Sequence, residues 1–131
     1  MGNIFNKFGG SGGGNIRVTE LFTGRFTTPG FMSLDLSEYK WILVCVYGGT
    51  GVTQSPVLIE VGGDYDIWGG GSYNPIYDSG HPSGSLITAD STGITVEHGG
   101  IAIGSVYGLK GLENYKYIQE SGDWYLKLVE E

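Results

Sequence analysis

Short apolar runs separated by glycine-rich turns recur along the chain, and this pattern constrains the fold more than any other feature. No segment keeps an apolar period of 3.6 residues over about ten residues, so the sequence does not favour helices. Glycine supplies 25 of the 131 residues, which is typical of a protein with many turns. About seven to nine short strands at intervals of roughly 8–12 residues predict an all-β fold, an antiparallel β-sandwich or jelly roll.

Several of these runs predict individual strands. The run KWILVCVY (40–47) is apolar on both faces, which indicates a central strand covered on both sides. The runs PVLIEV (56–61) and IAIGSVYGLK (101–110) are further strands. Residues 113–120 and 124–131 are expected to pair as a last hairpin across a Ser121-Gly122-Asp123 turn.

Two earlier turns predict hairpins as well. Residues 84–100 are expected to form one that closes around Asp90-Ser91-Thr92-Gly93. Residues 15–27 run to a turn at Thr28-Pro29-Gly30, from which residues 31–36 are expected to return. Proline and glycine supply the backbone angles that such a turn needs.

The N-terminal segment is separate from this folded part. Residues 9–14 read GGSGGG, which neither holds a helix nor fills a core, because glycine loses the most backbone entropy on folding. Three large apolar residues, Ile4, Phe5 and Phe8, precede it. We therefore expect a flexible N-terminal arm and linker over residues 1–14, whose apolar side chains either bind something or are disordered, and a β-sandwich head over residues 15–131.

Charge and composition argue against several classes of partner. The formal net charge of −7 and the seven scattered Lys and Arg residues argue against nucleic acid. No apolar run reaches the roughly 18–20 residues of a membrane span, and the N-terminus lacks the pattern of a signal peptide. The single cysteine, Cys45, excludes an internal disulfide. These features predict a chain that is made in a cytoplasm, and that is kept there or assembled into something larger, with no nucleic acid or membrane partner.

Catalytic chemistry is weakly supported by the sequence. His81 lies between Ser79 and Ser83, but a serine nucleophile needs a base that a third group orients, and nothing in the sequence shows this. A cluster of Asp64, Asp66 and Asp78 could hold Ca²⁺, although the spacing is not that of an EF-hand. We therefore expect no catalytic residue, no metal and no cofactor, and a chain that is not an enzyme.

Residues 64–81, DYDIWGGGSYNPIYDSGH, combine aromatic and polar side chains in one loop-rich stretch. Aromatic faces beside polar groups are what protein surfaces use to hold sugars or extended partners. The alternative is that some of these rings turn inward and close one end of the sandwich. The candidate ligand-binding residues are Tyr65, Trp68, Tyr73, Asn74, Tyr77 and His81.

Short motifs in residues 18–110 resemble those of tail-fibre, receptor-binding and related accessory proteins of tailed bacteriophages. The first motif corresponds to Leu21, Phe22 and Gly24, and it is followed by Ser33, Leu34, Ser37 and Tyr39. A strand that ends in Val106-Tyr107-Gly108-Leu109-Lys110 closes the pattern. Each motif is short and mostly structural.

The resemblance implies a β-sandwich or jelly roll that forms a homotrimer and that serves in virion attachment or host-surface binding. That family has no shared catalytic residue. Two features depart from it: the chain continues for 21 residues after Lys110, and fifteen residues stand where family members have a long fibrous stem.

The sequence therefore predicts a non-enzymatic virion protein of a bacteriophage, assembled in the host cytoplasm. Residues 1–14 would bind other virion proteins, and the β head would be exposed and could contact a host-surface glycan. The alternative is a free carbohydrate-binding, lectin-like module.

Overall fold

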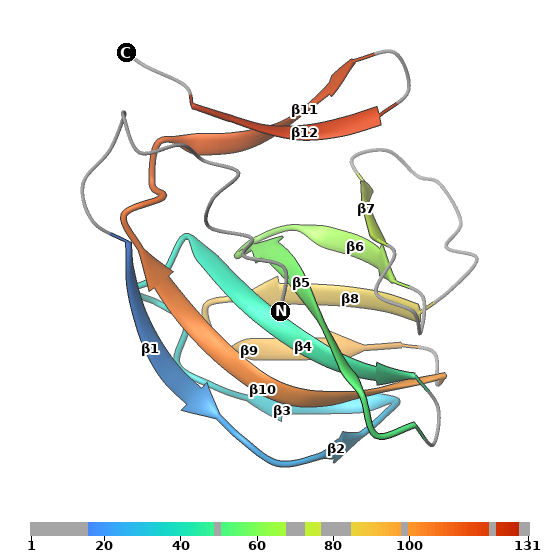
Figure 1. Ribbon diagram of the computed structural model, residues 1–131. Coiled ribbons are helices and arrows are strands. Elements are labelled where there is room, and N and C mark those ends of the chain that lie inside the picture. Colours follow the sequence, from blue (N-terminus) through green and yellow to red (C-terminus); the bar gives the residue numbers. More distant parts are fainter. Residues whose placement is uncertain are drawn as a thin grey trace.

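The computed structural model describes residues 16–48, 51–67, 73–76, 85–97, 100–120 and 123–128. These residues form antiparallel strands and the turns between them, with no helix among them. Two sheets pack face to face, and a two-stranded hairpin lies beside them (Figure 1). The predicted all-β antiparallel sandwich is confirmed.

The first sheet, sheet A, is built mainly around the strand 101–110. Its hydrogen-bonded order is β1-β10-β4-β5, and the short β2 pairs with β10 as well. The strands of sheet A are β1 (Arg17–Phe22), β2 (Phe26–Thr27), β4 (Trp41–Gly48), β5 (Gln54–Glu60) and β10 (Ile101–Lys110). The predicted strands 40–47, 56–61 and 101–110 are thus present, and β10 has the predicted bounds.

The second sheet, sheet B, lies across the core from sheet A (Figure 1). Its order is β3-β9-β8-β6-β7. The strands of sheet B are β3 (Gly30–Ser33), β6 (Asp64–Ile67), β7 (Tyr73–Ile76), β8 (Ser85–Asp90) and β9 (Gly93–Val96).

The hairpin predicted at residues 84–100 is formed by β8 and β9. Asp90 lies opposite Gly93, so Ser91 and Thr92 make the turn. The Asp90 carboxylate accepts hydrogen bonds from the backbone N–H of Thr92 at 2.8 Å and from its hydroxyl at 2.6 Å. Gly93 has a φ of +151°, and a Cβ there would lie 2.1 Å from the carbonyl oxygen of Met32, so this position requires glycine.

The hairpin expected around Pro29 is not formed. Phe26 lies opposite Ile103 of β10 in sheet A, whereas Phe31 lies opposite Thr95 of β9 in sheet B. The turn at Thr28-Pro29-Gly30 therefore carries the chain from one sheet to the other. A local turn signal does not distinguish this corner from a hairpin, because the partners of both strands come from residues about 65–75 positions later in the sequence.

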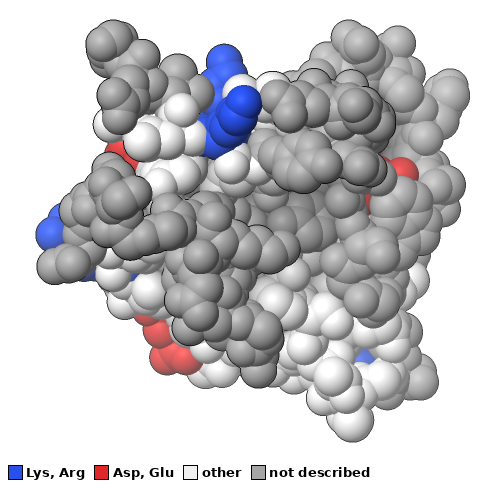
Figure 2. Space-filling model, turned by 45° about the horizontal axis from the view of Figure 1, so that its top comes forward, with Lys and Arg blue, Asp and Glu red and all other residues white. Residues whose placement is uncertain are grey.

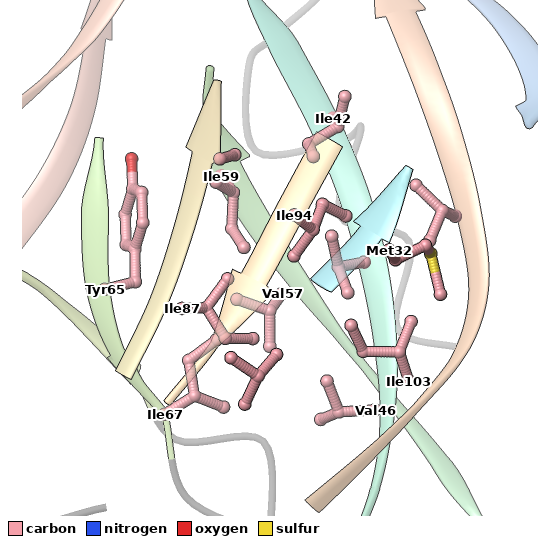
Figure 3. Close-up of a cluster of buried hydrophobic side chains, with 14 of the residues drawn as sticks. Met32, Ile42, Val46, Val57, Ile59, Tyr65, Ile67, Ile87, Ile94 and Ile103 are labelled. Carbon is pink, nitrogen blue, oxygen red and sulfur yellow. The ribbon is translucent and has the colours of Figure 1, made fainter. Parts of the chain in front are cut away.

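The inner core lies between the two sheets and consists of aliphatic side chains with Tyr65 (Figure 3). Strand alternation places Ile42, Val44 and Val46 of β4 in this core. Trp41 and Leu43, at the alternate positions of the same strand, point to the opposite face of sheet A and are buried in a second cluster. The prediction that the strand 40–47 is covered on both sides is thus confirmed.

The C-terminal hairpin, β11 (Tyr115–Glu120) and β12 (Asp123–Leu128), covers part of the outer face of sheet A. It pairs with neither sheet (Figure 1). Its apolar face packs on the second cluster, which we call the outer cluster. The buried members of the outer cluster are Trp41, Leu43, Leu58, Leu109, Leu112 and Tyr115, and Ile16, Tyr107, Tyr117, Leu126 and Leu128 pack against them.

Candidate functional site

The end of sheet A at which the described chain begins has contacts on both faces of the sheet, and we call this end the arm root. Ile16 is the first described residue, and it packs on the outer cluster. Arg17 then begins β1, directly opposite Lys110 at the end of β10. Residues 1–14 therefore connect to the head through an edge strand of sheet A.

Tyr39 fixes the position of Lys110 at the arm root. The Tyr39 ring lies on Gly108, where a Cβ would approach its carbon atoms to 2.5–2.7 Å. The Lys110 ammonium lies over the same ring, 5.4 Å from its centroid, and its Nζ is 3.3 Å from Glu38 Oε1. Glycine at position 108 is required by this close approach of an aromatic ring.

The contacts at the arm root give a structural role to the sequence motifs that resemble those of phage proteins. Tyr39 belongs to one motif, and Gly108 and Lys110 belong to another about 70 residues later. The structure brings them into contact, as a layer of glycine, ring and ammonium group. Leu21, Phe22 and Leu34 of the same motifs pack against the inner core. These motif residues thus serve packing in the described structure.

Tyr65 does not lie on a ligand-binding surface, which corrects its assignment as a candidate ligand-binding residue. Its side chain is 1% exposed and lies in the inner core (Figure 3). Its hydroxyl accepts a hydrogen bond from the backbone N–H of Glu60 at 2.8 Å. Tyr65 and Ile67 alternate with Asp64 and Asp66 along β6, so both apolar residues face inward.

The other candidate ligand-binding residues are only partly covered by the structure. Tyr73 and Asn74 lie on β7 at the edge of sheet B, where Tyr73 is opposite Ile67 and Asn74 is opposite Asp66. Trp68, Tyr77 and His81 lie outside the described residues, as do the anchor residues Ile4, Phe5 and Phe8. Their roles stay predictions.

The two described aspartates that were considered as metal ligands differ in burial. Asp64 is exposed and Asp66 is buried, although both lie on β6, and Asp78 lies outside the described residues. Within the described ranges no group of three or more His, Cys, Asp or Glu side chains is placed to hold a metal ion.

The C-terminal hairpin is held to sheet A by side chains, a docking that we did not predict from the sequence. The Tyr117 hydroxyl donates a hydrogen bond to the carbonyl of Leu58 at 2.8 Å, and its ring meets Trp41 edge-to-face at 5.4 Å. Lys40 Nζ donates to the carbonyl of Glu113, in the loop before β11, at 2.7 Å. The indole N–H of Trp41 is fully buried and has no hydrogen-bond partner within the described part of the chain.

Glu60 is a half-buried carboxyl close to this docked hairpin. Burial raises the pKa of Glu60 above its usual range, while the positive charges of Lys40 and Lys116 act in the opposite direction. Lys40 Nζ is 3.9 Å from Glu60 Oε2. The pKa stays raised because burial is the larger of these effects.

The Lys and Arg residues on the described strands all lie on sheet A and the C-terminal hairpin. The sequence has no Lys or Arg between residues 41 and 109, and β3 (GFMS) has none either, so the strands of sheet B carry none. Lys116 and Lys127 lie directly opposite each other on the C-terminal hairpin. Figure 2 shows blue side chains at separate places on this face of the molecule, the largest group near the top of the view. The strands of sheet A and the hairpin carry as many acidic as basic residues, whereas the charged residues on the strands of sheet B are all acidic.

No family model, no curated protein and no solved structure matches this chain. No helix among the described residues is long and apolar enough to cross a membrane.

Proposed function

We propose that this chain is a non-enzymatic structural protein of a bacteriophage particle. Residues 1–14 attach it to other virion proteins, and the β-sandwich head stands on the particle surface. The observation that carries the proposal is the arm root: the head begins at an edge strand of sheet A, where motif residues from distant parts of the sequence pack together. An arm that leaves from such an edge can extend without disturbing either face of the sandwich.

The arm has enough apolar surface for attachment only when several copies act together. Burial of Ile4, Phe5 and Phe8 would contribute about 1.5–3 kcal/mol for each side chain. Ordering of the arm backbone opposes this by about 1–2 kcal/mol per residue. Single arms are thus expected to bind weakly, and neighbouring arms on one assembly bind more tightly through their high effective concentration.

The charge distribution supports one orientation of the head. The arm joins the head at Arg17, opposite Lys110, on the sheet whose strands carry Lys and Arg residues. This end would face an acidic surface of the particle, and sheet B, whose strands carry Asp but no Lys or Arg, would face away from it.

Co-sedimentation tests the attachment directly. Particles are purified from the phage whose genome encodes the chain, stripped of this protein, and mixed with the full chain or with a variant in which Ile4, Phe5 and Phe8 are all serine. The full chain should sediment with the particles and the variant should stay in the supernatant. A chain with Val52→Ser is the matched control, because Val52 is 86% exposed in a loop of the head. Equal sedimentation of the full chain and the triple variant would refute the proposed role of the arm.

A further inference from the structure

The sandwich has four edge strands, and three of them are poor templates for a further strand. Exposed strand edges pair with other chains unless proline, short length or a covering group prevents it. Edge strand β7 contains Pro75, and edge strand β3 has only four residues. In sheet A, the two edges are β5 and β1.

Edge strand β5 is closed by three successive groups. Pro56 has no backbone N–H to donate. Two residues further on, the carbonyl of Leu58 accepts a hydrogen bond from the Tyr117 hydroxyl at 2.8 Å. After two more residues, the backbone N–H of Glu60 donates to the Tyr65 hydroxyl at 2.8 Å. Since alternate residues of a strand present their backbone to the same edge, these three groups together close the outer side of β5.

Edge strand β1 has none of these protections. It is six residues long and contains no proline. Residues 17–20 are exposed, and within the described ranges no strand lies on the outer side of β1. Its Val18 is 50% exposed, although it is an apolar residue in the regular part of the strand.

We propose that β1 is an assembly edge, and that it pairs with β1 of a second copy of this chain in an antiparallel arrangement. The partner must offer an open edge of similar length, and β1 is the edge on the described chain that meets this requirement. The proposal rests on the proposed function in one respect: copies attached to one particle lie close together, so that a weak edge-to-edge contact can form.

The charges on β1 select one register. A twofold axis perpendicular to the sheet passes through one residue, which then faces itself in the second copy. An axis at Arg17 or at Glu20 would place like charges directly opposite each other. An axis at Thr19 would place Val18 opposite Glu20.

An axis at Val18 avoids the like-charge contacts, and Ile16 then lies opposite Glu20. The two exposed Val18 side chains then face each other, and Arg17 lies opposite Thr19. The β-bulge between Glu20 and Phe22 ends the regular part of β1, so residues 16–20 form a pairing segment that is centred on Val18.

Sedimentation equilibrium of the full chain tests the pairing. The protein concentration is varied from about 10 μM to roughly 1 mM, because this range covers the effective concentrations expected on an assembly. The mass should rise from 14.0 kDa towards twice that value. Val18→Arg should keep the monomer mass throughout, because it places two cations opposite each other. Val52→Arg is the control with the same change at an exposed loop position, and it should dimerise like the unaltered chain.

A cross-link tests the register. In a Cys45→Ser background, Val18→Cys should form an interchain disulfide on mild oxidation, and Thr19→Cys should not. A monomer at every concentration would overturn the proposal, and so would a dimer or trimer that Val18→Arg leaves intact. Cross-linking through position 19 alone would overturn the Val18 register. None of these results depends on particle binding, so a failure of the proposed function is recognised separately.

Discussion

The contact between Gly108 and Tyr39 makes a quantitative prediction for Gly108→Ala. The added Cβ would lie 2.5, 2.6 and 2.7 Å from three atoms of the Tyr39 ring. Protein Cβ atoms do not approach other heavy atoms so closely, so the ring must move and take its contact with Lys110 with it. Overpacking of this kind costs about 1–3 kcal/mol.

A second effect opposes this cost. Glycine within a strand is less favourable than alanine by roughly 0.5–1 kcal/mol, which the substitution would recover. The middle values of these two ranges leave a net loss of unfolding free energy of about 1.3 kcal/mol. With a urea m value of about 2 kcal/mol/M, the midpoint of unfolding should fall by roughly 0.6 M.

A double-mutant cycle separates the steric contact from other causes. Urea unfolding is measured for the unaltered chain, Gly108→Ala, Tyr39→Ala, and the double variant. Without the Tyr39 ring, Gly108→Ala should cost little or should stabilise the protein, because only the strand preference remains. An equal cost of Gly108→Ala with and without the ring would refute the reasoning.

Two further predictions concern the docked C-terminal hairpin. Tyr117→Phe removes the hydroxyl that donates to the Leu58 carbonyl and should lower the unfolding free energy by about 1 kcal/mol in urea titrations; an unchanged midpoint would contradict the docking described above. For Glu60, the pKa is higher in the folded than in the unfolded chain, so the folded state holds the proton to higher pH. Its contribution to stability is then present below the unfolded pKa, near 4.5, and is lost as the pH rises through the folded pKa. Unfolding midpoints measured across this window should fall less steeply with rising pH in Glu60→Gln than in the unaltered chain. A steeper fall in the variant would contradict a raised pKa of Glu60 in the folded chain.

Features that depend on nearby residues could be predicted from the sequence. The β8–β9 hairpin carries its own turn chemistry at Asp90 and Gly93, and the double-sided apolar pattern of residues 40–47 indicates a strand covered on both faces. The path at Pro29 could not be predicted, because the same turn residues serve a hairpin and a corner between sheets. Long-range partners decide between the two.

One candidate ligand-binding residue, Tyr65, could have been assigned correctly from a local pattern. Alternation along DYDI places Tyr65 with Ile67, and this signal could have assigned Tyr65 to the core. The docking of the C-terminal hairpin had a weaker signal, the apolar Tyr115, Tyr117, Leu126 and Leu128 at alternate positions. The pairing of β1 with β10 joins residues about 90 positions apart, and no local pattern determines such a contact.

The proposal that the chain is a component of a phage particle can be tested on the particles themselves. The most direct test is quantitative mass spectrometry of particles purified through a density gradient, from the phage whose genome encodes the chain. Peptides of this protein are expected at a constant ratio to the major capsid protein across the particle peak. Their absence from that peak, with the protein found in the soluble fraction alone, would contradict it.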